Sequence, residues 1–396
     1  VSITVEALSI VDKLDLINPS GITYKILGVG VNVFEITANQ TAFRIRTKDG
    51  ATSTISRASV QEITDDTNLP RIDYTGGEGH WLFEPQSTNL LTYSEDFSQW
   101  LLDGSQSSPT ITTDTSPDGS SQVYQIELNS SGNVYRTISI SSSVDYTFSV
   151  YIKGTGNGRL ILSNPQATPE NYVDFTATSE WQRIELTGIS SSTSVRLAIG
   201  SWSGSAASGT IQIFGAQFEQ KSYPTSYIPT NGSTVTRLAD AAFGAGSSDL
   251  INSTEGVLYA EIAALSDNGT DRYILLSDGI ANNNSIRLLY HSSSFYVFFQ
   301  KWVNGVRTTN LNINSITKTD FNKIAIRYNA IQVSVFLNGV NILNNSDTNT
   351  IAPNTLNVLN FDSGGFNSAK FFGKTKCVAV FKEALTDAEL TCLTTI

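Results

Sequence analysis

The chain of 396 residues is short of charge, histidine and cysteine, and it contains no methionine. Asp, Glu, Lys and Arg make up 15% of it, against about 25% in typical soluble proteins. Long surface helices draw on Glu and Lys, so this shortage disfavours them, whereas the abundant Ser, Thr, Asn and Gly suit short strands and tight turns. The hydrophobic share of 40% is enough for packed cores, and the length predicts two or three domains.

The net charge of −11 has the wrong sign for nonspecific nucleic-acid binding, which needs a basic surface. No apolar run approaches the roughly 18 residues of a membrane span. The opening VSITVEALSI lacks the basic region of a secretory signal, so loss of an initiator methionine is the simpler account of Val1. We therefore expect no nucleic-acid partner and no membrane insertion.

Catalytic and zinc-binding side chains are few: His80, His291, Cys377 and Cys392 are the only residues of their types. A histidine-based hydrolase needs a nucleophile and a carboxylate beside the histidine, and neither local sequence supplies them. The cysteine spacing fits no zinc site, which leaves either buried or partly buried thiols or a disulfide that holds a last helix. Composition does not exclude a glycosidase, which needs only two carboxylates. The E-x-D-x-x-E run of concanavalin-A-like glucanases is nevertheless missing, and we expect no enzyme.

The strand patterns predict an all-β chain of three units. Residues 1–70 form a small β-rich unit with an Asp49-Gly50 turn. Its position in the chain suggests a role in attachment or assembly, and a simple structural cap is the alternative. In residues 71–235, YTFSVYIKG places Tyr146 and Phe148 on one face and Thr147 and Ser149 on the other. Such strands, separated by Ser/Gly/Asn clusters, predict an antiparallel jelly-roll sandwich.

Residues 245–396 form the third unit. Two Asn-Gly pairs, at 304–305 and 338–339, predict hairpins because both residue types tolerate positive φ. Thr386 and Glu389 form a capping box for a short final helix.

An extended link, GAQFEQKSYPTSYIPTNGSTVTRLAD, spans residues 215–240. Pro224 and Pro229 favour extended backbone in the residues before them. Tyr223 and Tyr227 would clamp the link onto a neighbouring domain.

This link closely resembles one in bacteriophage and prophage structural proteins, where a carbohydrate-binding-module-like jelly roll ends in such a run. The stretch RIDYTGGEGHWLFEPQSTNLLTYSEDFSQW, residues 71–100, continues the resemblance. FNKIAIRYNAIQVSVFLNGV and VAVFKEALTDAEL resemble the laminin-G-like, concanavalin-A-like lectin fold, with Phe321 where that family often has Trp. The resemblance implies a virion component with a jelly roll and a C-terminal concanavalin-A-like sandwich.

Three aromatic residues are candidates for glycan binding, because sugars stack on aromatic faces beside a few polar groups. Trp202 lies in the polar loop GSWSGS and has little local core to join. Tyr296 and Trp302 flank a hairpin strand on which Phe298 and Gln300 share one face and Val297 and Phe299 the other. The face that does not cover the core fits either a sugar site or a homo-oligomer interface.

Structural calcium is the cofactor that such sandwiches can hold, with loop carboxylates as ligands. The candidates are Glu95, Asp96, Asp267, Asp271 and Asp278. The spacing of an EF-hand is absent.

These observations predict a non-enzymatic appendage or surface protein of a phage or phage-like particle, located on the capsid or tail, that displays glycan-binding domains for host adhesion. Its expected partners are other virion proteins, host surface glycan and copies of itself, most simply in a trimer. Two alternatives remain: a purely structural capsid or tail decoration, and a polysaccharide-degrading enzyme.

Overall fold

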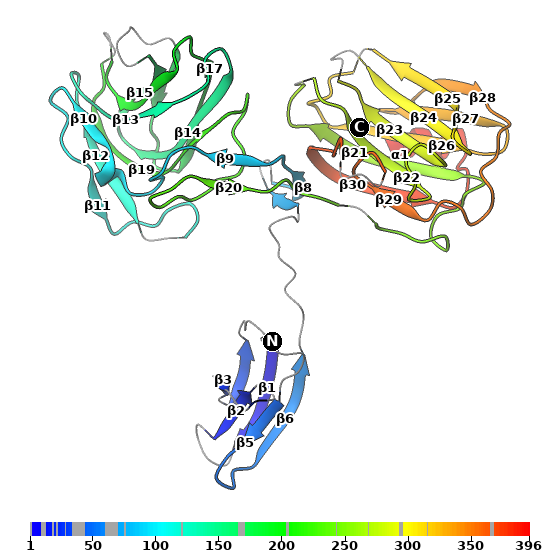
Figure 1. Cartoon of the computed structure of the whole chain (residues 1–396), viewed down its shortest axis with the longest axis horizontal. Helices are drawn as coiled ribbons and strands as arrows, with labels where there is room; N and C mark the ends of the chain where they lie inside the picture. Colours follow the sequence, from blue (N-terminus) through cyan, green and yellow to red (C-terminus); the bar gives the residue numbers. More distant parts are fainter. Residues whose placement is uncertain are drawn as a thin grey trace. The chain divides into compact units, whose positions relative to one another are not determined.

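The computed structural model describes residues 2–8, 13–17, 20, 23–27, 29–33, 44–59, 70–74, 77–119, 122–164, 171–202, 206–242, 244–267, 269–292, 296–314, 316–364 and 368–396. They belong to two compact units, Val1–Asp66 and Thr67–Ile396. Antiparallel sheets dominate both units, and the described residues hold a single α-helix (Figure 1). The predicted all-β class is therefore confirmed. None of the described helices has the length and apolarity to cross a membrane.

The N-terminal unit consists of two three-stranded sheets, with the strands β1 (Ser2–Leu8), β2 (Leu14–Ile17), β3 (Thr23–Ile26), β4 (Gly30–Val33), β5 (Arg44–Thr47) and β6 (Ser53–Ser59). The sheet orders are β4-β1-β6 and β3-β2-β5. Asp49 and Gly50 both have positive φ, as the turn prediction requires. The turn links β5 to β6, which lie in different sheets, so it is no hairpin.

The jelly roll packs two five-stranded sheets, built from β10 (Leu101–Asp103), β11 (Thr110–Thr112), β12 (Val123–Leu128), β13 (Asn133–Ser139), β14 (Asp145–Gly154), β15 (Asn157–Ser163), β16 (Asn171–Thr176), β17 (Gln182–Ile189), β18 (Ser194–Gly200) and β19 (Gly209–Glu219). Their orders are β10-β13-β18-β15-β16 and β11-β12-β19-β14-β17. The predicted inward residues Tyr146 and Phe148 lie in the core between the sheets. The short 3-10 helix η2 (Phe97–Gln99) also contributes Phe97 to that core.

The link at 215–240 packs back on the jelly roll. Its strand β20 (Val235–Arg237) pairs with β9 (Ser87–Asn89). The Tyr227 ring contacts Phe214 and Tyr151 of the jelly roll, with centroids 5.4 and 6.5 Å away, and its hydroxyl bonds to Ser94. The predicted clamp onto a neighbouring domain is thus wrong for Tyr227, because its partners belong to the domain that the link leaves.

Buried polar groups hold this link in place. The Glu219 carboxylate is fully buried and accepts hydrogen bonds from the Ser87 hydroxyl at 2.5 Å and the Thr225 amide at 2.9 Å. Glu84, 2% exposed, accepts from the Ser226 amide and from Arg237. A buried carboxylate is tolerated only with such partners, so these acids specify one path for the link.

The C-terminal sandwich packs a seven-stranded sheet on a five-stranded one, with the strands β7 (Arg71–Asp73), β8 (His80–Phe83), β21 (Gly256–Ala264), β22 (Arg272–Ser277), β23 (Ser285–Tyr290), β24 (Val297–Val303), β25 (Val306–Ile313), β26 (Asn322–Tyr328), β27 (Gln332–Leu337), β28 (Val340–Ser346), β29 (Val358–Asn360) and β30 (Gly373–Phe381). The orders are β28-β27-β26-β21-β30-β8-β7 and β25-β24-β23-β22-β29. Both predicted Asn-Gly hairpins form, between β24 and β25 and between β27 and β28. Helix α1 (Asp387–Thr394) starts with the predicted capping box.

The sheets differ from the predicted division in one respect. Residues 71–83, assigned from sequence to the jelly roll, supply β7 and β8 to the C-terminal sheet, where Phe83 pairs with Gly373 of β30. Phe83 is 1% exposed and stacks on Phe361 at a centroid distance of 4.8 Å. The jelly roll is therefore an insertion between the first two strands of the C-terminal sandwich and the rest of it. The ends of the insertion meet, because the Asp240 amide donates to the Glu84 carbonyl at 2.9 Å.

Candidate functional site

The outer face of the five-stranded C-terminal sheet gathers aromatic, amide and guanidinium groups. Along β24, Val297 and Phe299 are fully buried in the core, while Phe298 and Trp302 point to the other side and are half-buried. This alternation confirms the predicted split of the strand. Gln300 of β24 pairs with Arg287 of β23 on one side and with Asn310 of β25 on the other. We call this surface the aromatic–arginine face; its residues are Tyr273, Arg287, Phe298, Gln300, Trp302, Arg307 and Asn310.

Trp302 lies at the centre of the polar contacts on this face. The Arg287 guanidinium carbon lies 4.8 Å from the centroid of the indole, and that of Arg307 lies 5.8 Å away. The indole Nε1 donates to Gln300 Oε1 at 3.3 Å, and Gln300 Nε2 donates to Asn310 Oδ1 at 3.0 Å. Cations over an aromatic face hold the ring in one orientation.

Arg287 is unusually buried for an arginine on an outer face, at 4% exposed. Its Nε donates to Ser285 Oγ at 2.7 Å and its Nη1 to Asn282 Oδ1 at 2.8 Å. Burial lowers the pKa of the Arg287 guanidinium, and the neighbouring Arg307 charge acts in the same direction. The guanidinium is therefore fixed in position and partly stripped of water.

Tyr296 precedes β24, so it lies at the opposite end of that strand from Trp302. Its ring lies 5.9 Å from Phe298, whose other ring neighbour, His291, lies 5.1 Å away. The structure thus places both C-terminal glycan candidates along one strand, and Phe298 lies between them in the sequence.

Trp202, the third glycan candidate, belongs to the jelly roll and follows β18. The Arg196 guanidinium lies 3.5 Å from the Tyr135 ring centroid and 4.5 Å from that of Trp202. Arg196 Nη2 donates to Asp103 Oδ2 at 2.7 Å and to Asn133 Oδ1 at 3.2 Å. Each sandwich therefore has a tryptophan beside an arginine on its outer surface.

The calcium candidates in the jelly roll are engaged in protein hydrogen bonds. Asp96 caps η2 by accepting from the Ser98 amide at 3.1 Å, and it accepts from the Tyr124 hydroxyl at 2.7 Å. The hydrogen bonds from Ser98 and Tyr124 outweigh burial and lower the pKa of Asp96. Glu95 accepts from the Tyr227 hydroxyl at 2.9 Å.

The other three acids are engaged as well. Asp267 pairs with the Lys318 ammonium at 3.2 Å, and Asp271 accepts from the Ser292 amide at 2.6 Å. Asp278 accepts from the Asn283 amide group at 2.7 Å. Within the described ranges, no three His, Cys, Asp or Glu side chains come together as metal ligands. Structural calcium therefore stays a prediction, and the described residues bring no set of carboxylates together to hold the ion.

The histidines and cysteines have ordinary surroundings. His80 begins β8, is 4% exposed and packs its ring edge on Phe321 at 5.4 Å, with Nε2 3.2 Å from an Asp73 oxygen. Cys377 and Cys392 are free thiols and not a disulfide, but both are exposed, so the expected burial of the thiols is wrong.

Lys301 points into the core side of β24, where it is 2% exposed. Its ammonium lies 3.7 Å from Asp347, and that carboxylate accepts from the Thr308 and Thr309 hydroxyls at 2.7 and 2.5 Å. Burial opposes ionisation of Asp347, but these hydrogen bonds hold its pKa at about 2.

The sequence analysis did not identify Arg287 beside Trp302 or Arg196 beside Trp202. Alternation along β23 puts Arg287 on the outer side, but only the strand register shows that it meets Gln300.

No family model matches this chain, and no curated protein does. Among solved structures, it is similar to the CBM40 of a Ruminococcus gnavus IT-sialidase, with 16% identity over 36% of this chain and 84% of that one and a TM-score of 0.32. Mouse laminin α1 domains LG4-5 give 8% identity over 68% of this chain and 91% of that one, with a TM-score of 0.30. Sheep galectin-11 gives 10% identity over 35% of this chain and 96% of that one, with a TM-score of 0.27. At these TM-scores the likenesses carry no functional argument.

Proposed function

We propose that this chain is a non-enzymatic glycan-binding protein and that the aromatic–arginine face is its sugar-binding surface. The observation that carries the proposal is the row Arg287–Gln300–Asn310 beside Trp302. The half-buried indole of Trp302 offers apolar surface to a sugar ring, and the exposed Asn310 amide and Arg307 guanidinium beside it can bind hydroxyls. Because Arg287 and Gln300 are already held by hydrogen bonds, little ordering is required on binding.

The setting of this activity is also a proposal. The resemblance of the link at 215–240 to phage structural proteins supports a place on the surface of a phage or phage-like particle, with the N-terminal unit contacting other virion proteins or copies of the chain. Several copies on one particle raise the effective concentration, so weak single sites suffice for host adhesion.

A second candidate, a purely structural particle decoration, is favoured by the jelly roll. There Arg196 lies between Tyr135 and Trp202 and is also bonded to Asp103, so its contacts are met within the chain. Such a cluster stabilises a surface without needing a ligand. Trp202→Ala separates the two candidates: a lower melting temperature with unchanged glycan binding assigns Trp202 to structure.

The test of the proposed sugar surface is Trp302→Ala, measured for melting temperature and for binding to a glycan array. We expect the melting temperature to stay within a few degrees and glycan binding to fall about tenfold or more. Stacking of a nucleic-acid base on an aromatic ring is worth about 1–3 kcal/mol, and we take the same range for a sugar ring. Trp81→Ala is the matched control, because Trp81 is 48% exposed on the other sheet of the same sandwich. Retained binding by Trp302→Ala, or equal loss in both variants, would refute the assignment.

A further inference from the structure

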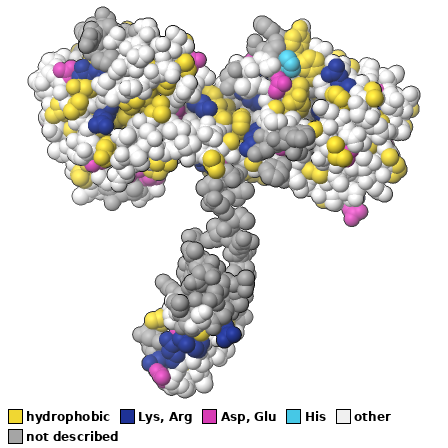
Figure 2. Space-filling model, in the orientation of Figure 1, with side chains coloured by type: hydrophobic (Ala, Val, Ile, Leu, Met, Phe, Trp, Pro, Cys, Tyr) yellow, Lys and Arg dark blue, Asp and Glu magenta, His cyan; other side chains and the backbone are white. Residues whose placement is uncertain are grey.

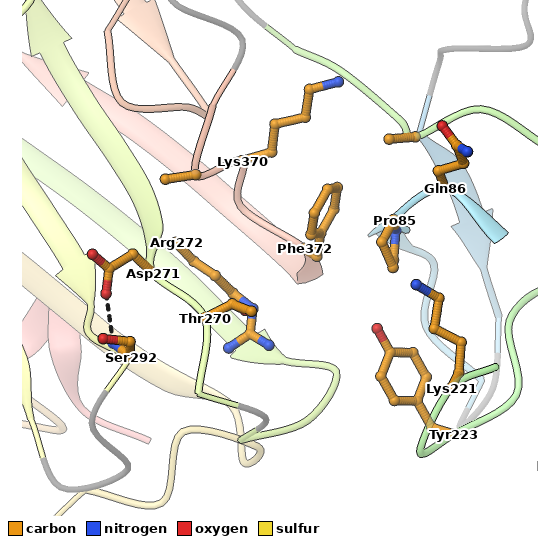
Figure 3. Close-up of a pocket in the computed structure, with 12 residues that line it drawn as sticks. Pro85, Gln86, Lys221, Tyr223, Thr270, Asp271, Arg272, Ser292, Lys370 and Phe372 are labelled. Atoms are coloured by element: carbon orange, nitrogen blue, oxygen red, sulfur yellow. Dashed lines mark hydrogen bonds between the residues drawn. The ribbon is translucent and has the colours of Figure 1, made fainter. Parts of the chain in front are cut away.

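A cavity of about 740 Å³ lies where the link meets the C-terminal sandwich. Lys221 and Tyr223 enter it from the segment after β19, Arg272 from the start of β22, and Lys370 and Phe372 from the segment before β30. Figure 3 shows the Lys221 ammonium and the Tyr223 hydroxyl on one wall, facing Arg272 and Phe372 on the other. Its volume lies within the range of small-molecule sites, about 300–1,000 Å³.

The charge of the cavity is opposite to that of the protein. Three of its lining residues, Lys221, Arg272 and Lys370, are cationic, and one, Asp271, is anionic. The Asp271 carboxylate is held on the wall by the Ser292 amide at 2.6 Å. In a chain of net charge −11, whose visible surface is dominated by uncharged groups (Figure 2), this is a local concentration of positive charge.

Burial makes these cations receptive to an anion. Arg272 is 2% exposed, and burial lowers its pKa, although the nearby Tyr223 opposes the shift. Burial likewise lowers the pKa of Lys221, against the opposing charge of Glu219. A cation that is shielded from water is stabilised most by an oxyanion that accepts charge-assisted hydrogen bonds from it. Burial also raises the pKa of Tyr223 to about 12, so its hydroxyl stays protonated at neutral pH and able to donate.

The remaining walls suit a compact hydroxylated body. Phe372, Pro85 and the ring of Tyr223 offer apolar surface, whereas Thr270 and Gln86 offer hydrogen-bonding groups. We propose that this cavity binds an acidic sugar of the hexuronic acid class, with its carboxylate held by the Lys221 ammonium and the Tyr223 hydroxyl, which lie on the same wall (Figure 3). The proposal does not rest on the aromatic–arginine face, because the two sites share no residue.

The experiment titrates the intact chain with D-glucuronate by calorimetry, with D-glucose and inorganic phosphate as comparison probes. Glucose differs from glucuronate only in carrying a hydroxymethyl group in place of the carboxylate, so we expect glucuronate to bind and glucose to give no saturable heat. Raising the salt above about 0.15 M should weaken the binding of glucuronate, because the attraction is partly screened. Tighter binding of phosphate than of glucuronate would overturn the acidic-sugar class, as would equal binding of glucose.

Two variants locate the site. Lys221→Met and Lys370→Met keep the aliphatic stem and remove one charge each, and both residues are partly exposed, which protects the fold. We expect Lys221→Met to weaken glucuronate binding about tenfold or more, the effect of losing a hydrogen bond to a charged group. Lys370→Met removes a positive charge elsewhere on the lining, so we expect a smaller loss of binding. Lys382→Met is the matched control on an exposed position outside the cavity. Trp302→Ala should bind glucuronate normally, which separates this site from the proposed sugar surface. Unchanged glucuronate binding in both cavity variants would overturn the proposal.

Discussion

Phe83→Ala tests whether β8 belongs to the C-terminal sandwich. The side chain is 1% exposed, stacked on Phe361 and edge-on to Phe371 at 6.4 Å. Removal of a buried phenylalanine costs about 3–5 kcal/mol, through lost transfer energy and the cavity left behind. A loss of 1 kcal/mol lowers the melting temperature of a domain of this size by about 2–4 °C, so we expect a fall of roughly 6–20 °C.

The location of the loss matters as much as its size. Hydrogen exchange followed by mass spectrometry reports protection strand by strand, so β21 and β26 should lose protection while β14 and β19 keep theirs. Ile72→Ala on the adjacent strand β7 is the control: Ile72 is 55% exposed, and its truncation should change stability by no more than about 0.5 kcal/mol. Earlier loss of protection in β14 and β19, or a Phe83→Ala effect as small as that of the control, would show that β8 does not support the C-terminal core.

Three further predictions follow from buried acids and thiols. Glu84→Ala should lower the free energy of unfolding by about 3–5 kcal/mol in urea titration, because it leaves the 8%-exposed Arg237 side chain without this partner; an effect below 1 kcal/mol would contradict it. The pKa of Asp347 is held at about 2 in the folded protein. Its ionisation therefore contributes about 2 kcal/mol to the free energy of unfolding, which is fully present above about pH 4 and is lost as the pH falls through 2. Asp347→Asn should therefore flatten the stability profile between pH 4 and 2, and an unchanged slope would count against the assignment. Cys377 and Cys392 should both react with a thiol reagent in the native protein without reductant, and a single or absent reaction would indicate that one is shielded or bonded.

Local patterns in the sequence predicted most of the fold. Alternation along β14 identified Tyr146 and Phe148 as core, and the Asn-Gly pairs identified two hairpins, because these signals depend on near neighbours. The membership of β8 was missed because its partner Gly373 is almost at the other end of the chain. The burial of Glu84 was also beyond local reasoning, since its partners lie far away in sequence.

For the candidate sites, too, local sequence patterns predicted some features and missed those that depend on the fold. Alternation along β24 predicted that Phe298 and Gln300 share one face and Val297 and Phe299 the other, and the structure confirms this split by placing Val297 and Phe299 in the core. The positions of Arg287 beside Trp302 and of Lys221 opposite Arg272 depend on strand register and on the path of the link. No spacing in the sequence encodes either meeting, so the cavity could be recognised only from the fold.

The inserted position of the jelly roll sets the order in which this protein can fold during synthesis. Strands β7 and β8 leave the ribosome early, yet Phe83 pairs with Gly373 of β30, which is made near the end. The jelly roll holds all ten of its strands in one stretch, so it can fold while the chain is still growing. The hydrogen bonds between Glu84 and Asp240 then hold the end of β8 next to the stretch of chain that leads into the remaining strands of the C-terminal sandwich. The folded jelly roll would thus remove its own residues from the loop between Phe83 and Gly373, which lowers the entropic cost of closing the final sheet.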